Sequence, residues 1–182
     1  EKGESKFLTA GVTSQGKYDF KYGKVKIRAR FQSAKGAWPA LWMLKSAAKW
    51  GKPGMGEIDL MEHLNYDDKV YQTVHSHYTV NIKDPKAPKK SGTAKIVRDK
   101  WNTYGAEWDS EKIVFTVNGK PTHTYSRMPE KGKHQYPFTS PFYLLLSMQI
   151  EGKWVGKPDA KDYPAWMEVD WVRVYQKEQA KK

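Results

Sequence analysis

The sequence of 182 residues contains no cysteine, and this absence excludes disulfide bridges, zinc–thiolate sites and a thiol nucleophile. Long apolar runs are also lacking, since no stretch approaches the roughly 20 residues that a membrane-spanning helix needs. The sequence does not begin with a charged segment followed by an apolar one, so we expect any export signal to lie outside it. We therefore expect one folded domain over residues 1–182, with no transmembrane segment.

Helical periodicity is scarce as well. No window combines apolar residues spaced three and four apart with capping residues over a useful length. The one short helix that the pattern predicts covers residues 38–50, WPALWMLKSAAKW. Low helix content favours a mainly β protein.

Acidic residues are outnumbered: 32 Lys and Arg stand against 20 Asp and Glu, for a net charge of +12. The basic residues are dense in residues 83–100, KDPKAPKKSGTAKIVRDK. A helix-turn-helix, RNA-binding or zinc-finger motif does not accompany the charge, so nucleic acid is not an expected partner. A solvated basic surface and a surface for a sulfated or acidic polysaccharide both remain open.

Stretches rich in β-branched and aromatic residues, separated by turn residues, predict strands. They cover residues 24–31, 69–80, 112–125, 142–150 and 167–176. Asn118-Gly119 between two alternating runs predicts a hairpin, and residues 83–92 predict a long surface loop. The fold class we expect is an all-β antiparallel sandwich of the jelly-roll kind.

Aromatic residues are abundant, with eight Trp and eleven Tyr. Trp38, Trp42, Trp50 and Trp154 stand near Gly or Pro rather than within apolar alternation. Each alone is compatible with a place in the core, but the excess as a group indicates an aromatic-lined cleft. Aromatic faces fit the apolar face of a sugar ring, so the expected ligand is a carbohydrate.

Three carboxylates lie close together in the stretch GMGEIDLMEHL. On a strand, Glu57 and Asp59 share a face, whereas Glu62 points to the other face unless one extra residue near Leu60 or Met61 forms a β-bulge. With a bulge, all three carboxylates line one face. Two carboxyl groups about 5 to 5.5 Å apart are the machinery of a retaining glycosidase, and the third can hold their charge states apart. A solvated edge strand and a calcium site are the alternatives.

Two histidines, His75 and His77, share a strand face by the same parity. They can hydrogen-bond sugar hydroxyls or tune the acid, and we expect His75 to be the functional one. A zinc site is not expected, because no third ligand stands at a suitable spacing.

The sequence resembles a known family, glycoside hydrolase family 16. The motif Glu-x-Asp-x-x-Glu of that family is matched by Glu57, Asp59 and Glu62. The resemblance covers nearly the whole chain. It extends to YDFKYGKVKIRARF, GAWPALWML, QTVHSHY, YGAEWDSEKIVFTVNGK, EGKWVG and MEVDWVRVYQ.

The resemblance implies a concanavalin-like jelly roll with a concave substrate cleft and endo-acting, retaining hydrolysis of β-linked glycans. It implies that Glu57 is the nucleophile, Glu62 the general acid/base and Asp59 the assisting carboxylate. The positions that match substrate subsites are Trp38, Trp42, His75 and Trp154. No cofactor is implied for the reaction.

With its extra residue between Asp59 and Glu62, the motif resembles that of the bulged branch of the family, which includes laminarinases, agarases, carrageenases and endo-β-galactosidases. The segments YQTVHSHYTVNIKDP and PFYLLLSMQIEGKWVG are most similar to gut-bacterial members that act on β-galactosidic host glycans. Cleavage of β-1,3-glucan is the alternative. A jelly roll that binds sugar without catalysis is the alternative from another class. A secreted, periplasmic or surface-attached bacterial protein is expected.

Family members usually have strands before the segment that matches residues 4–20. The resemblance therefore implies that a first strand pair is missing or is supplied by another polypeptide. If no other polypeptide supplies it, the expected protein is a monomer. The family's structural calcium often uses an acid of the last strand, here Asp170, together with N-terminal ligands, so a calcium ion there is an expectation as well.

Overall fold

The computed structural model describes residues 7–47, 52 and 54–178, and within them the chain forms two antiparallel sheets. The first sheet has the strand order β1-β10-β3-β4-β5-β6. Its strands are β1 (Ala10–Thr13), β10 (Phe142–Ile150), β3 (Ala37–Lys45), β4 (Gly56–Glu62), β5 (Lys69–Ser76) and β6 (Ser91–Lys95).

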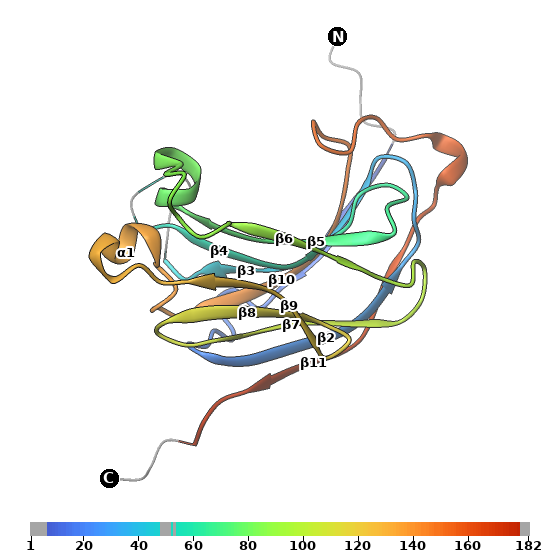
Figure 1. Ribbon diagram of the computed structural model, residues 1–182. Helices are drawn as coiled ribbons and strands as arrows, with labels where there is room; N and C mark the ends of the chain where they lie inside the picture. The colour runs from blue at the N-terminus through green and yellow to red at the C-terminus, as the bar shows by residue number, and fades with distance from the viewer. Residues whose placement is uncertain (1–6, 48–51, 53, 179–182) are drawn as a thin grey trace.

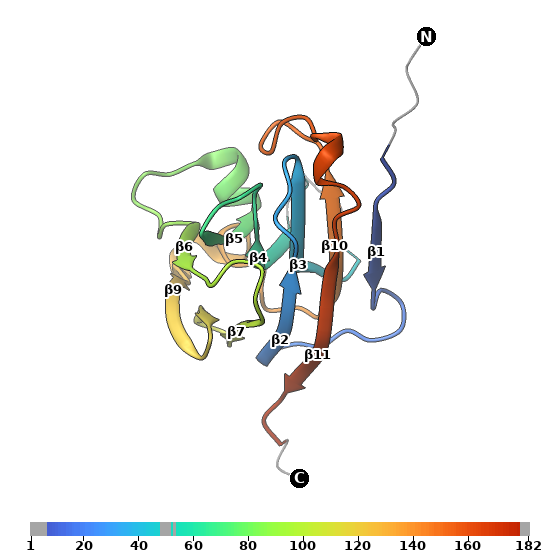
Figure 2. The same cartoon turned by 90° about the vertical axis from the view of Figure 1, so that its right-hand side faces the viewer.

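The second sheet has the order β11-β2-β7-β8-β9. Its strands are β11 (Met167–Tyr175), β2 (Gly23–Phe31), β7 (Asn102–Trp108), β8 (Lys112–Val117) and β9 (Lys120–Ser126). The two sheets lie face to face as layers (Figure 1), and β1 forms an edge beside β10 (Figure 2). This is the expected β-sandwich of the jelly-roll kind.

Helices in the described residues are short. They are a π-helical turn at Tyr78–Ile82, 3₁₀ turns at Pro129–Lys131 and Ala160–Asp162, and α1 (Gly132–Gln135). They lie between strands, so the sheets alone form the layers of the fold (Figure 1).

The core lies between the two sheets and follows from strand alternation. In β2, Val25, Ile27 and Ala29 are fully buried, while the residues between them are partly exposed. In the facing sheet Ile58 and Val74 are equally buried. Full burial of one such side chain contributes about 1.5–3 kcal/mol, so these rows hold the layers together.

The predicted hairpin at Asn118-Gly119 is confirmed. It connects β8 to β9, with φ of 51° at Asn118 and 79° at Gly119. Two successive positive φ values are those of a type I′ turn, whose twist matches the flanking strands. The strands predicted over residues 24–31, 142–150 and 167–176 are confirmed within one residue at each end.

The helix predicted for residues 38–50 is wrong over its described part, because residues 37–45 form β3. Alternation was hidden in this stretch since both faces of the strand carry apolar side chains. Leu41 and Met43 enter the core, whereas Trp38 and Trp42 line a cleft on the other side. Trp50, expected among the aromatic residues of the cleft, lies outside the described residues.

The strand predicted over residues 69–80 ends earlier, at Ser76. The Ser76 amide donates to the Thr79 hydroxyl at 2.9 Å, and the Thr79 amide donates to the Ser76 hydroxyl at 3.2 Å. These reciprocal bonds give the backbone partners outside the ladder, so the chain turns into the π-helical segment. The loop expected at residues 83–92 runs from there to β6, which begins at Ser91.

Candidate active site

The three carboxylates of β4 leave the same face of the first sheet. Glu57, Asp59 and Glu62 all line hollows on its outer side, away from the core. The apolar residues between them are fully buried between the sheets; they are Ile58, Leu60 and Met61. One strand thus presents acids to a cleft and apolar side chains to the core, as the bulge interpretation predicts.

A β-bulge places Glu62 on this face. Opposite β3, Met61 pairs with Leu41 and Asp59 pairs with Trp42, so Leu60 is the residue without a partner. Opposite β5, Asp59 pairs with Thr73 and Glu62 pairs with Tyr71. The bulge is confirmed, and the extra residue on the β3 side is Leu60 rather than Met61.

Gln72 supports the bulge from inside the core. It is fully buried on β5, facing the two bulged residues, and its Nε2 donates to the backbone oxygen of Leu60 at 3.0 Å. Thr122 in turn donates to the Gln72 side-chain oxygen at 2.5 Å. A bulge removes backbone groups from the ladder, and the amide of Gln72 satisfies one of them. Sequence reasoning missed this residue. The signal was a polar side chain on the strand face that also carries Val70 and Val74.

The cleft consists of two hollows that meet at the carboxylates. One has a volume of about 390 Å³ and lies over β3 and β10. Its walls include Trp38, Trp42, Tyr143, Ser147 and Gln149. The other has a volume of about 370 Å³ and lies over β5 and the start of β6. Its walls include Trp38, Tyr71, Thr73, His75, Lys90 and Trp154.

Glu57 and Glu62 line both hollows, so a chain that fills the cleft passes over them. Sequence reasoning missed the polar wall from β10, where Ser147 and Gln149 alternate with core residues.

Hydrogen bonds fix the indole groups of Trp38 and Trp42, and ring contacts hold that of Trp154. Trp38 Nε1 donates to Glu62 Oε1 at 3.0 Å, and Trp42 Nε1 donates to Ser147 Oγ at 3.1 Å. The Trp154 ring packs edge to face with the rings of Trp38 and Tyr71. The ring centroids are 5.4 Å apart in the first pair and 5.0 Å apart in the second. The structure thus brings Trp38, Trp42 and Trp154 to the cleft, as expected.

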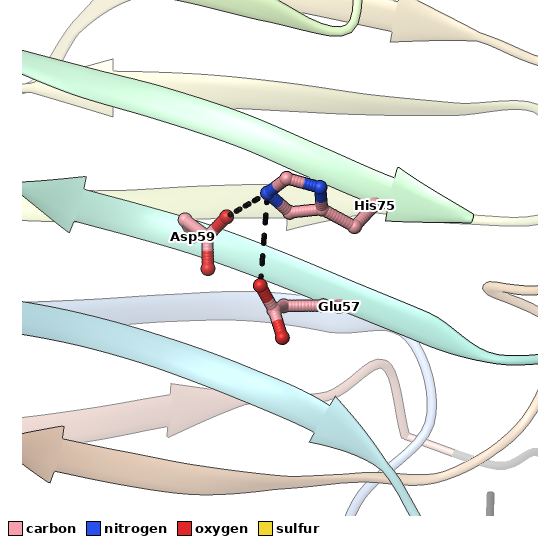
Figure 3. A group of neighbouring side chains, drawn as sticks. All are labelled: Glu57, Asp59 and His75. Atoms are coloured by element: carbon pink, nitrogen blue, oxygen red, sulfur yellow. Dashed lines mark ion pairs between the residues drawn. The ribbon is translucent and has the colours of Figure 1, made fainter. Parts of the chain in front are cut away.

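His75 lies on β5 directly opposite Glu57. Its Nε2 is 3.3 Å from Asp59 Oδ2 and 3.7 Å from Glu57 Oε1, and the three side chains point toward one another (Figure 3). His77 is different: β5 ends before it, and its ring lies 5.7 Å from that of His134, lining neither hollow. The expectation that both histidines share the strand face is therefore wrong for His77.

Burial raises the pKa of all three carboxyl groups. For Glu57, burial and then the charge of Asp59 raise the pKa to about 8. Asp59 is only 2% exposed, and burial together with the charge of Glu62 raises its pKa well above the usual range. Burial also raises the pKa of Glu62, against the effect of the Trp38 hydrogen bond. The cluster therefore retains protons at neutral pH.

The pKa of His75 moves the other way. Burial lowers it, and the charge of Glu57 opposes that change. A lowered pKa keeps the imidazole neutral at pH 7, so His75 acts on the carboxyls as a hydrogen-bonding group rather than as a cation.

Metal-capable side chains gather at one place in the part of the chain that the structure describes. One group of three has its ligand atoms within 4.8 Å of one another, formed by Glu57, Asp59 and His75. Asp170 is not in it: it lies at a bulge in β11 and is ion-paired with Arg28. Residues 1–6 are outside the described residues, so a calcium ion at Asp170 stays a prediction. In the described residues, no helix is long and apolar enough to cross a membrane.

These features define a β-sandwich whose cleft has carboxyl groups on its floor and aromatic rings in its walls, which is the class of site suited to carbohydrate chains. The chain belongs to glycosyl hydrolases family 16, whose family model matches residues 4–173.

Two curated relatives illustrate the range of the family. The chain is 39% identical over 171 residues to a keratan-sulfate endo-1,4-beta-galactosidase of Sphingobacterium multivorum, covering 93% of this chain and 40% of the relative. It is 32% identical over 181 residues to a beta-glucanase of Rhodothermus marinus, covering 93% of this chain and 62% of the relative. The chain thus spans less than two thirds of either.

Solved structures agree with the fold. The laminarinase of Flavobacterium sp. UMI-01 superimposes with a TM-score of 0.80 at 28% identity, covering 91% of this chain and 72% of that one.

Proposed function

We propose that this chain carries the catalytic site of an endo-acting, retaining glycoside hydrolase. The observation that supports this most directly is the bulged strand β4, which presents three carboxyl groups at the meeting point of two sugar-sized, aromatic-walled hollows. Family membership and the names of the relatives support the same reaction class.

In the first step, Glu62 donates its proton to the glycosidic oxygen while the Glu57 carboxylate attacks the anomeric carbon. The bond to the leaving sugar breaks and a glycosyl ester of Glu57 forms. Burial raises the pKa of Glu62, and this direction favours the protonated form that the role requires. The Trp38 indole holds the carboxyl of Glu62 in place.

In the second step, Glu62 takes a proton from water, and the oxygen attacks the anomeric carbon. The ester bond breaks, Glu57 leaves as a carboxylate, and two inversions give net retention. Glu57 must be ionised to attack. Its proton therefore has to pass to Asp59, the most buried of the three acids, which shares a hydrogen bond with Glu57 and whose pKa burial raises well above the usual range. His75 contacts both groups. No cofactor takes part.

For the substrate we propose a chain with β-galactosidic bonds, of the kind found in host glycans. The support is the relative named keratan-sulfate endo-1,4-beta-galactosidase, which at 39% identity exceeds the 32% of the beta-glucanase. A β-1,3-glucan is the second candidate, favoured by the match to a laminarinase structure. A polysaccharide substrate suits a secreted, periplasmic or surface-attached bacterial protein that acts as a monomer, and we propose that too.

A sugar-binding jelly roll without catalysis is the competing proposal. It uses the aromatic walls but has no need for buried, mutually repelling acids, each of which disfavours the folded state when ionised. The acids therefore favour catalysis.

The test replaces each acid. Glu57→Gln and Glu62→Gln should each lower hydrolysis of the preferred glycan by about a thousandfold or more. The measurements are new reducing ends and mass analysis of products over a panel of β-galactans and β-glucans. Glu107→Gln, an exposed acid of the second sheet, is the control. Undiminished hydrolysis in both cleft variants contradicts the proposal, and binding by the parent protein without bond cleavage favours the sugar-binding alternative.

Azide separates the two roles. With an activated aryl glycoside, Glu57→Gly should let azide attack from the face that Glu57 occupied and give an α-glycosyl azide. Glu62→Gly should give a β-glycosyl azide, because azide then attacks the ester intermediate. The opposite pair of products would exchange the two assignments.

A further inference from the structure

The basic stretch at residues 83–100 is not used by the mechanism, yet it reaches the cleft through Lys90. Lys90 directly precedes β6, and its backbone oxygen accepts a hydrogen bond from the Val74 amide at 2.8 Å. Its side chain lines the same hollow as Glu57, His75 and Trp154. The hydrogen bond to β5 thus fixes the main chain of Lys90 beside the cleft.

Within the described part of the chain, no carboxylate lies within ion-pair distance of the Lys90 ammonium. The other lysine of the cleft differs. Lys45, in the hollow over β3 and β10, already donates to the backbone oxygen of Gly54 at 2.8 Å. Lys90 therefore has its charge available to a ligand, whereas Lys45 is engaged by the protein.

The positive charge continues along the same side of the cleft. Lys69 and Lys95 are direct partners in the β5–β6 ladder, and Lys69 Nζ lies 5.5 Å from the centroid of the Tyr71 ring that lines the hollow. Like charges directly opposite each other on a sheet are destabilising. Their retention beside a sugar-sized hollow is understandable if a bound ligand supplies the opposite charge.

An uncharged glycan offers the Lys90 ammonium only hydroxyl oxygens, whereas an anionic substituent adds a charge-assisted hydrogen bond, which is roughly twice as strong. The same cation offsets the repulsion between that anion and the ionised Glu57 of the proposed mechanism. We propose that Lys90 is a specificity residue that binds an anionic substituent of the glycan, a sulfate ester or a carboxylate, in the hollow over β5 and β6. This inference rests on the proposed function for the identity of the cleft, and adds to it the charge of the substrate.

The experiment compares matched substrates: a sulfated galactan chain, the same chain after chemical desulfation, and a chain with uronate carboxylates. Lys90→Gln should lower kcat/KM on the sulfated chain on the order of tenfold or more beyond its effect on the desulfated one, because a charge-assisted hydrogen bond is lost. Lys90→Arg should restore most of the difference. Lys100→Gln removes one charge from the same basic stretch but lines neither hollow, and should leave the ratio unchanged. The uronate chain shows which anion is accepted.

Lys90 is also close enough to influence the acids. Burial raises the pKa of Asp59, and the charge of Lys90 opposes this change. If Lys90 serves only in that way, Lys90→Gln will lower kcat/KM equally on the sulfated and desulfated chains and displace the pH profile. That result, or an unchanged ratio, overturns the inference.

Failure of the proposed function gives a different outcome, namely no hydrolysis of any chain. Calorimetry then tests the inference alone, with Glu57→Gln and the double variant Glu57→Gln/Lys90→Gln. Tighter binding of the sulfated chain that requires Lys90 supports it, and equal binding of both chains by both variants contradicts it.

Discussion

At the scale of single residues, the site depends on acids whose environments differ although their chemistry is the same. Asp59 is the most buried, Glu57 is flanked by His75, and Glu62 accepts a hydrogen bond from Trp38. Differences of this kind separate the proton affinities of neighbouring carboxyls and so divide the roles of acid and nucleophile among them.

Trp38 offers a direct test of that division. Its indole donates to Glu62 and lowers the pKa of this carboxyl. Trp38→Phe should therefore raise the pKa of Glu62 and move the basic limb of the kcat/KM profile to higher pH, because Glu62, the proposed general acid, then keeps its proton to higher pH. Trp42→Phe removes an equivalent bond to Ser147 and should leave that limb in place. An identical displacement in both variants would show that the change is only one of shape.

Glu57 should make the stability of the fold dependent on pH. Burial and the charge of Asp59 raise its pKa to about 8, whereas an unfolded chain has a value near 4.3. Between these two values the folded state holds the proton more tightly, so stability falls as pH rises through this window.

Glu57→Gln removes that dependence. It should have nearly the same stability as the parent at pH 4 and exceed it by on the order of 2–4 kcal/mol at pH 8. Thermal unfolding from pH 4 to 9 measures this. Glu107→Gln, an exposed residue, should show no such increase, and parallel curves for Glu57→Gln and the parent would refute the buried-acid interpretation.

At the scale of elements, β4 is decisive because one extra residue changes the sheet face to which the following side chains point. Leu60 has no partner on β3, and Gln72 binds its backbone oxygen from the core. Without the extra residue, Glu62 would point between the sheets, where an unpaired acid is strongly unfavourable.

Deletion of Leu60 should therefore abolish activity and lower stability, whereas Leu60→Met, which keeps the length and nearly the volume, should cost less than about 1.5 kcal/mol. Met61→Leu should behave like Leu60→Met. Reducing-end assays and urea unfolding provide the measurements. Equal activity of the deletion and of Leu60→Met would contradict the role of the bulge.

At the scale of the whole molecule, the cleft extends on both sides of the acids, with one hollow over β3 and β10 and the other over β5 and β6. Carboxyls in the middle of a cleft can meet a bond inside a long chain. The net charge of +12 and the stretch at residues 83–100 place much positive charge around this fold, which assists the approach of an anionic polymer.

Cleavage inside the chain has a simple signature. The viscosity of the preferred polysaccharide should fall well before the reducing ends approach completion, and early products should be mixed in length. Viscometry together with chromatography of the products measures both. A single short product from the first minutes onward would instead indicate action from a chain end.

The sequence by itself determined the strand pattern, the Asn118-Gly119 hairpin and the three acids, because each depends on local alternation or turn chemistry. The sequence also predicted the bulge. The odd spacing between Glu57 and Glu62 requires one extra residue if both acids are to lie on the same face of the strand. Where both faces of a strand are apolar, as in residues 38–45, alternation vanishes and the pattern predicts a helix in place of the strand.

Only the tertiary structure decided which residues meet across strands. Gln72 reaches Leu60 from β5, Ser147 binds Trp42 from β10, and Lys90 enters the cleft from a loop. These contacts join residues far apart in the chain and depend on strand register, which local patterns do not encode. His77 shows the same limit in reverse, because the turn at Ser76 ended the parity that would have placed it beside His75.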